Sequence, residues 1–232
     1  MTSPIDVSVV LPAYLEEENL RLLLPRLKAV SEGMGVTFEI LVVDTVTPLD
    51  STPDVCRQQG AAYLARVGSN SYGSAIRTGI RAAQGRHIVF MDADGSHPPE
   101  FLPKLFEFRN DYDVVVASRY AEGGHAENPR HLVWMSRVLN WSYAIVLNLR
   151  CKDVSNSFKL YRGEQLKSLK LRSDNFDIVE EILFKLNRRF RVRIKEVPFT
   201  FKKRMFGQTK RNLVLFMLTY LVTLIRLRFS RD

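Results

Sequence analysis

The first half of the chain alternates between short apolar runs and longer segments in which leucines recur at helical spacing. This alternation limits the possible folds more than any other feature. The clearest run, residues 38–44, is almost entirely apolar, as strands covered on both faces tend to be. Strands separated by helices are typical of a parallel, doubly wound α/β sheet. The expected strands are residues 7–11, 38–44, 62–65, 87–91 and 113–117, and the expected helices are residues 16–34, 73–83 and one that follows Pro98 and Pro99.

The pattern changes after residue 118. The expected elements there are a long, mostly apolar helix at 134–149, a strand at 157–161, a helix at about 177–187 and a strand at 192–197. We expect them to form a second layer built onto the sheet, because no linker separates them from it. Residues 1–211 are therefore expected to be one domain, and residues 212–232 a C-terminal helix attached to it.

The composition excludes disorder of the whole chain and indicates a compartment. Of the 232 residues, 46% are hydrophobic and 25% are charged, as in folded globular proteins. Cys56 and Cys151 lie far apart and match no metal-ligand spacing, which is typical of a reduced, cytoplasmic protein. The first strand-like run begins at Val7, so no secretion signal is expected.

Positive charge is concentrated near the C-terminus. The chain has a net charge of +9, but residues 185–232 contain 14 Lys or Arg and only two acidic residues, which is a net charge of +12. This charge distribution predicts an anionic partner: nucleic acid, anionic lipid or a phosphorylated substrate. A solvated basic face is the alternative.

Polar side chains follow three of the expected strands. Pro12, Tyr14 and Glu16 follow the first, Asp44 ends the second, and Asp-Ala-Asp at 92–94 follows the fourth. Ligands of parallel sheets bind outside the carboxyl ends of the strands. Two aspartates at positions i and i+2 can both face a hard cation such as Mg²⁺ or Mn²⁺, which takes its other ligands from water and substrate phosphates. The alternative is an Asp-capped turn, which Gly95 and the following prolines favour.

The helix expected from Gly73 begins in a segment of small residues, Asn-Ser-Tyr-Gly-Ser-Ala at 70–75. Small residues at a helix start allow the backbone to approach a ligand closely. The segment is not a Walker A loop, because it lacks the Gly-Lys-Ser/Thr ending, and it lacks the GxGxxG pattern of dinucleotide-binding folds.

Five motifs occur in a fixed order along residues 7–210. They are Val-Leu-Pro-Ala-Tyr at 10–14 with Glu16 and Glu17, Asp-Ala-Asp-Gly-Ser at 92–96, Ala-Ser-Arg-Tyr at 117–120 with Gly123 and Gly124, Asp-Val-Ser-Asn-Ser-Phe-Lys-Leu-Tyr-Arg at 153–162, and Glu-Val-Pro at 196–198 with Arg-Met-Phe-Gly-Gln-Thr-Lys at 204–210. The set resembles the VPAYNEE, DAD, GSRY…GG, D-x-TSGFR-x-YR and EVP…R-x-x-G-x-SK segments of family 2 glycosyltransferases, specifically the dolichol- and polyprenyl-phosphate sugar synthases. The resemblance implies the GT-A fold, a mostly parallel, doubly wound sheet flanked by helices.

On the donor side, the resemblance implies that Asp92 and Asp94 bind Mg²⁺ or Mn²⁺ and, through it, the diphosphate of a GDP- or UDP-linked sugar. Arg204 and Lys210 would close over the diphosphate as a basic clamp. The residues that would hold the nucleotide-sugar itself are Pro12, Tyr14, Glu16, Asp44, Gly73 and Asp92.

On the acceptor side, the resemblance implies that Arg119 and the pair Ser136-Arg137 meet the phosphate of a polyprenyl phosphate. The candidate catalytic residues are Asp94, Arg119, Arg204 and Lys210.

Several positions depart from the family pattern. Thr45 stands where the family commonly has a second aspartate after Asp44, and Val46-Thr47 stands where it has Gly-Ser, which leaves the nucleotide base open. Ser96 stands where related synthases often have Gln, and Asn156-Ser157 replaces Ser-Gly. Arg130 lies six residues before Ser136, whereas the basic residue of the family lies four before it.

The segment at 213–225 is an apolar helix flanked by basic residues. At about 1.5 Å per residue its 13 residues extend about 20 Å, which is shorter than the roughly 30 Å of a bilayer core. Its polar stripe consists of Asn212, Thr219, Thr223 and Arg226. We expect a helix lying in a membrane interface. A buried helix or an oligomer contact is the alternative. The apolar centre argues against nucleic acid.

These features predict a metal-dependent, inverting glycosyltransferase that acts peripherally at the inner face of the membrane. A polyprenyl phosphate is already anionic, so no general base is expected. Two alternatives stay open. The first is transfer to a saccharide or other hydroxyl, for which Glu180, Glu181 or Asp153 would be the candidate base. The second is a non-catalytic scaffold that binds nucleotide-sugar, suggested by Thr45 and Val46.

Overall fold

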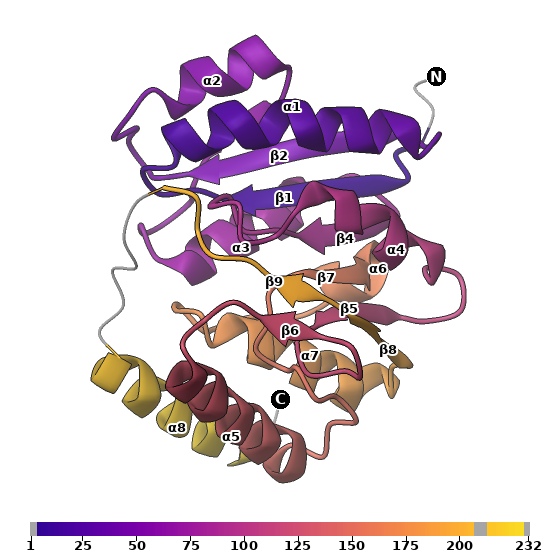
Figure 1. Cartoon of the computed structure of the whole chain (residues 1–232), viewed down its shortest axis with the longest axis vertical. Coiled ribbons are helices and arrows are strands. Elements are labelled where there is room, and N and C mark those ends of the chain that lie inside the picture. Colours follow the sequence, from indigo (N-terminus) through magenta and orange to yellow (C-terminus); the bar gives the residue numbers. More distant parts are fainter. Residues whose placement is uncertain (1–3, 207–212, 230–232) are drawn as a thin grey trace.

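The structure is a computed structural model that describes residues 4–206 and 213–229. Its centre is a seven-stranded sheet in the order β3-β2-β1-β4-β7-β5-β8 (Figure 1). Neighbouring strands are parallel, except that β7 runs antiparallel to both β4 and β5. The predicted mostly parallel α/β fold is confirmed. The strands are β1 (Val7–Pro12), β2 (Phe38–Asp44), β3 (Ala62–Ala65), β4 (His87–Phe90), β5 (Val114–Ser118), β7 (Lys159–Arg162) and β8 (Ile194–Pro198).

The apolar runs are buried because helices cover both faces of the sheet. Successive residues of a strand point to opposite faces. In β1, Val9 enters the core shared with α1 (Glu17–Gly33), and Val10 enters the core shared with α3 (Tyr72–Ala82). The first core also contains residues of α2 (Thr52–Gln59), the 3₁₀ turn η1 (Pro99–Phe101) and α4 (Leu102–Glu107), and the second those of α6 (Gly163–Lys167) and α7 (Ile178–Phe190).

The second half of the chain does not form a separate layer of strands, and this part of the sequence prediction was wrong. β7 lies inside the sheet, between β4 and β5, and β8 extends the sheet beyond β5. β4 and β5 therefore do not pair with each other, and the backbone of each forms hydrogen bonds with β7. A short parallel pair, β6 (His125–Ala126) with β9 (Thr200–Phe201), links the segment after β5 to the segment after β8.

Helices α5 (Arg130–Val146) and α8 (Leu213–Phe229) lie side by side at the lower edge of the molecule in Figure 1. The Tyr143 hydroxyl donates to the carbonyl oxygen of Tyr220 at 2.7 Å. Two polar residues of α8 reach the protein: Thr223 Oγ1 donates to Asp177 Oδ2 at 2.6 Å, and Arg226 Nη2 donates to Ser173 Oγ at 2.6 Å. The 17-residue α8 is longer than predicted, and Asn212 lies outside the described residues. No helix in the described ranges has the length and apolarity needed to cross a bilayer.

Candidate active site

Asp92 and Asp94 stand in a tight turn directly after β4. Ser96 donates to Asp94 Oδ1 through its backbone N–H at 3.0 Å and through its hydroxyl at 2.6 Å, and Gly95 has a φ of +81°. The predicted alternative, an Asp-capped turn, therefore occurs together with the paired carboxylates. Both side chains remain about one quarter exposed, at 26% and 22%. The turn consequently presents two carboxylates at the carboxyl edge of the sheet.

His97 supports this turn from below. Its Nδ1 accepts the backbone N–H of Asp92 at 2.9 Å, and its ring stacks on Phe158 with centroids 4.9 Å apart. The side chain is completely buried, and this burial lowers the pKa of His97. A neutral imidazole with an accepting Nδ1 fixes the backbone at the point where the strand ends.

Residues 202–206 lie over the turn that holds the two aspartates. Met205 N–H donates to the carbonyl oxygen of Asp94 at 3.0 Å, and Lys202 N–H donates to that of Ser96 at 3.2 Å. A Cβ on Gly95 would lie 2.5 Å from Met205 Cε and would be strained at the φ of +81°, so this position suits glycine. This contact brings Arg204 to the two carboxylates, with its Nη1 3.9 Å from Asp94 Oδ2.

Glu16 is the present partner of Arg204. Its Oε1 accepts a hydrogen bond from Arg204 Nη2, and its Oε2 accepts one from Asn19 Nδ2 at 2.5 Å. Burial raises the pKa of Glu16, and the nearby guanidinium opposes that effect. Sequence analysis predicted Glu16 and Arg204 as separate ligands of the donor, and the structure brings them together.

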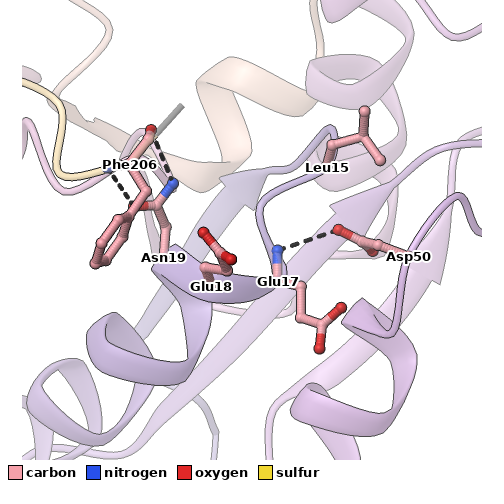
Figure 2. Close-up of a pocket in the computed structure, with 6 residues that line it drawn as sticks. All are labelled: Leu15, Glu17, Glu18, Asn19, Asp50 and Phe206. Atoms are coloured by element: carbon pink, nitrogen blue, oxygen red, sulfur yellow. Dashed lines mark hydrogen bonds between the residues drawn. The ribbon is translucent and has the colours of Figure 1, made fainter. Parts of the chain in front are cut away.

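A cavity of about 250 Å³ lies beside Glu16, between the start of α1 and the loop after β2. Figure 2 shows its lining, with Glu17 N–H donating to Asp50 Oδ2 at 3.1 Å and Asn19 hydrogen-bonded to the backbone of Phe206. Leu15 also lines it and has a φ of +57°, a left-handed conformation that asparagine adopts more readily than leucine. Strain of this kind is common where the chain shapes a ligand site.

Arg66, which sequence analysis did not single out, joins the strand ends around this region. It donates to the backbone carbonyl oxygens of Asp44 at 3.1 Å and Asn70 at 2.6 Å, and also to that of Ala13. One guanidinium therefore holds the ends of β1 and β2 and the loop before α3. Asp44 is buried beside it, and burial raises the pKa of Asp44.

Three of the remaining residues predicted for the donor side lie in the described part of the chain. Pro12 ends β1 beside Val43, and Tyr14 is 42% exposed. Gly73 packs against the chain itself: an added side chain would lie 2.2 Å from the carbonyl oxygen of Ser173, and its N–H donates to the carbonyl oxygen of Asp174 at 2.7 Å. Lys210 lies outside the described residues.

A second cavity, of about 420 Å³, is lined by two of the three predicted acceptor residues, Arg119 and Arg137. Arg119, Arg130 and Arg137 line it together with Tyr120 and Trp134. The guanidinium of Arg137 lies 5.4 Å from the centre of the Tyr120 ring. Neither Arg130 nor Arg137 forms a salt bridge with another described residue, so their charges are available to an anion. Ser136 lies on the same helix, where its carbonyl oxygen accepts from Asn140 Nδ2 at 2.7 Å.

Arg119 is bound by Asp153. Its Nε and Nη2 donate to the two carboxylate oxygens at 2.8 and 2.6 Å, and Nη2 also donates to Ser155 Oγ at 2.9 Å. Burial acts to lower the pKa of Arg119, but the Asp153 carboxylate outweighs it and holds the pKa above its usual value. Arg119 is therefore a fixed cation at the wall of the cavity.

The sequence of this chain matches a known protein family. Residues 8–169 match the family described as Glycosyl transferase family 2. The chain belongs to glycosyl transferase family 2. Relatives with similar sequences include a dolichol-phosphate mannosyltransferase of Pyrococcus furiosus, 34% identical over 212 residues, covering 88% of this chain and 58% of that protein. Others are a dolichol-phosphate mannosyltransferase of Saccharomyces cerevisiae, 34% identical, covering 89% and 81% of the two chains, and an undecaprenyl-phosphate mannosyltransferase of Micrococcus luteus, 33% identical, covering 88% and 86%.

Solved structures with low sequence identity have a similar fold. A glucosyl-3-phosphoglycerate synthase of Mycobacterium tuberculosis, crystallised with Mn²⁺, UDP and phosphoglyceric acid, matches with a TM-score of 0.77 and 19% identity over 98% of this chain and 80% of that chain. The predicted family and the predicted GT-A fold are confirmed.

The three carboxylates predicted as bases for a hydroxyl acceptor do not line either of the two cavities described above. Asp153 is fully buried against Arg119. Glu181 accepts from the backbone N–H groups of Arg172 and Ser173 and from Lys185. Glu180 is completely buried in α7, and burial raises its pKa to about 8. Each of the three carboxylates is therefore buried in the fold, and none of them is placed to act as the base that a hydroxyl acceptor would need.

The buried Glu180 predicts a pH dependence of stability. At neutral pH it is protonated in the folded protein but ionised in the unfolded chain, so the folded state binds more protons and stability falls as pH rises from about 4.5 to about 8. Glu180→Gln should flatten this part of the stability curve and stabilise the protein at pH 7 by roughly 3 kcal/mol. Urea denaturation at several pH values measures it. Glu32→Gln, at an exposed position, is the control, and an unchanged slope in Glu180→Gln would contradict the assignment.

Proposed function

We propose that this family 2 protein is a metal-dependent, inverting glycosyltransferase that moves a sugar from a nucleotide-diphosphate sugar to a polyprenyl phosphate at a membrane surface. One observation carries the proposal. A pair of carboxylates with Arg204 beside it and an arginine-lined cavity are held by a single segment, residues 153–157, through Ser157 to Asp92 and through Asp153 to Arg119. The donor and acceptor phosphates would thus be bound on two sides of this one segment.

The two aspartates fit a divalent cation that is shared with a diphosphate. Among the described residues, no group of three His, Cys, Asp or Glu side chains could enclose a metal by itself. Mg²⁺ and Mn²⁺ are commonly held by one or two carboxylates, with phosphate oxygens and water completing the shell. The Mycobacterium tuberculosis synthase of similar fold was crystallised with Mn²⁺ and UDP together, which supports a cation shared with a nucleotide diphosphate. When bound, the cation would neutralise charge that develops on the leaving diphosphate.

The residues of the chain would position the reactants and balance charge. Arg204 is held by Glu16, and a donor diphosphate at Asp92 and Asp94 would compete with Glu16 for its guanidinium. Lys210 would join Arg204 at the leaving group. Arg137 and Arg119 would hold the acceptor phosphate in line for direct displacement, which inverts the anomeric carbon. Because that phosphate is already anionic, positioning and electrostatic stabilisation carry the reaction without a general base.

The lipid part of the acceptor is suggested by the surface beside the second cavity. On α5, Trp134, Trp141 and Ile145 are 57–68% exposed, and on α8, Val222, Ile225 and Phe229 are 61–77% exposed. The two helices lie side by side (Figure 1), and Trp134 also lines the arginine-rich cavity. Exposed Trp and aliphatic residues next to basic ones are typical of a surface that lies in a membrane interface. We call these six residues the α5–α8 face and propose that it rests on the membrane, so that the polyprenyl chain reaches the cavity from the bilayer.

Weakening the α5–α8 face should weaken membrane binding. The double variant Trp141→Ser with Ile225→Ser removes one large apolar side chain from each helix, and we expect binding to anionic liposomes to fall about tenfold. Liposome co-sedimentation measures it. Leu22→Ser, at a 50% exposed position of α1 on the opposite side of the molecule, is the matched control. If the double variant and the control bind liposomes equally well, the α5–α8 face is not the membrane-binding surface.

The transfer reaction itself tests the proposed function. The full chain is incubated with Mn²⁺, a polyprenyl phosphate and a panel of GDP- and UDP-linked hexoses, mannose among them because the named relatives transfer it. We expect one donor to yield a lipid-linked sugar whose anomeric configuration, read by NMR, is opposite to that of the donor. The absence of lipid-linked product with every donor, or a product with retained configuration, would contradict the proposal.

A further inference from the structure

Each of the two proposed metal carboxylates is tied to a serine hydroxyl through one oxygen. Asp92 Oδ1 accepts from Ser157 Oγ at 3.0 Å and, at the longer distance of 3.5 Å, from the Tyr72 hydroxyl, and Asp94 Oδ1 accepts from Ser96 Oγ at 2.6 Å. The other oxygen of each carboxylate makes no hydrogen bond to a described residue. The nearest cationic or imidazole nitrogens are 3.8 and 3.9 Å away, on His97 and Arg204. The serines thus restrict carboxylate rotation and leave one oxygen of each aspartate for a cation.

The two serines differ in what they imply. Ser96 follows Asp94 by two residues, and a local turn explains its contact. Ser157 lies 65 residues from Asp92 in the sequence, on the segment that leads into β7, and is only 9% exposed. In the family pattern this position carries glycine, which has no hydroxyl to offer. The contact between Ser157 and Asp92 is therefore a tertiary contact, which no local turn explains.

The segment around Ser157 is rigidly anchored. Asn156 Nδ2 donates to the carbonyl oxygen of Ala117 at 2.5 Å, and the buried Lys159 Nζ donates to that of Val154 at 2.9 Å. Ser155, two residues before Ser157, accepts a hydrogen bond from Arg119 through its Oγ. These contacts fix the position of the Ser157 hydroxyl. Rotation of the Asp92 side chain would therefore break its hydrogen bond to Ser157, because the hydroxyl cannot follow.

We propose that Ser157 is a positioning residue of the metal site: its hydroxyl orients the Asp92 carboxylate and sets the affinity of the site for the divalent cation. The proposal rests on the proposed function, because it takes Asp92 and Asp94 as ligands of a cation shared with a nucleotide diphosphate. Partners of ligating carboxylates commonly change metal affinity by 10–100-fold when removed.

The test measures metal affinity and not only turnover. Free Mn²⁺ is titrated by electron paramagnetic resonance with the full chain and saturating GDP or UDP. Ser157→Ala and Ser157→Gly should each weaken Mn²⁺ binding about tenfold, whereas Ser157→Thr, which keeps a hydroxyl, should stay within about twofold of wild type. Ser168→Ala removes a hydroxyl that donates to a backbone carbonyl oxygen far from the site and is the matched control.

The outcomes separate this inference from the function on which it rests. If wild type binds Mn²⁺ with nucleotide and the Ala and Gly variants bind it equally well, the positioning role of Ser157 is wrong while the metal site stands. If wild type binds no Mn²⁺ with either nucleotide, the proposed function fails first. Thermal melts accompany each variant. Should Ser157→Ala fold poorly, the comparison of Gly with Thr still decides whether affinity follows the hydroxyl.

Discussion

Replacing Asp94 by asparagine is expected to reduce sugar transfer roughly 10³-fold, and Asp92→Asn should have an effect of the same order. Each change removes a negative charge from the proposed cation site, and several kcal/mol of transition-state charge stabilisation would be lost with the cation. The fold should be retained, because Asn has the shape of Asp and its side-chain oxygen can still accept from Ser96. Initial rates with saturating donor and Mn²⁺ measure the effect, and melting temperatures within a few degrees of wild type would show that folding is unaffected.

The matched control for the Asp94 variant is Asp54→Asn, which neutralises a carboxylate of an exposed pair with Arg57 on α2. Its transfer rate should equal that of wild type. If Asp94→Asn keeps full turnover, or if the wild-type rate is the same in excess chelator, the assignment of the two aspartates to a metal site is wrong.

The second large effect concerns the buried pair Arg119–Asp153. Arg119→Met leaves the Asp153 carboxylate buried without its cation, and we expect a loss of about 3–5 kcal/mol in the free energy of unfolding. For a chain of this size that corresponds to a melting temperature lower by roughly 10 °C. Differential scanning calorimetry measures it.

The double variant Arg119→Met with Asp153→Leu separates the stability of the pair from its role in the reaction. Replacing both partners by apolar side chains should recover most of the lost stability, because no unpaired charge remains buried. Transfer to polyprenyl phosphate should stay low in the double variant, since the cation at the wall of the cavity is still missing. A double variant with wild-type activity would show that Arg119 is only structural.

The order of elements could be predicted from the sequence because it depends on local pattern. The runs at 38–44 and 62–65 are short and apolar between helical segments, and they became β2 and β3 with the same bounds. The position of β7 could not be predicted. Its apolar run indicates a strand, but its place between β4 and β5 depends on which open edges the returning chain can pair with. The sequence could also not place α2, because its eight residues are mostly polar.

The candidate site was predictable where residues lie within motifs and much less so where they act through tertiary contacts. Asp92, Asp94 and Arg204 were expected together and are found together. Arg66 is a lone arginine at the end of an edge strand, and its four carbonyl acceptors come from three separate segments. Likewise, the stripe of Thr223 and Arg226 gives α8 a polar side, but whether that side faces water or Asp177 depends on the buried carboxylate of another helix.

The central claim is that the acceptor is a phosphate, whose own charge makes a general base unnecessary. The most direct measurement compares the initial rates of sugar transfer to a polyprenyl phosphate and to the uncharged polyprenol of the same length, with the same donor and Mn²⁺. We expect transfer to the phosphate and a rate indistinguishable from background with the alcohol, because the alcohol has no charge for Arg119 and Arg137 to bind and Glu127, a carboxylate that lines the cavity, accepts from the backbone N–H of Lys203 at 3.1 Å. Comparable rates with both acceptors would contradict the claim.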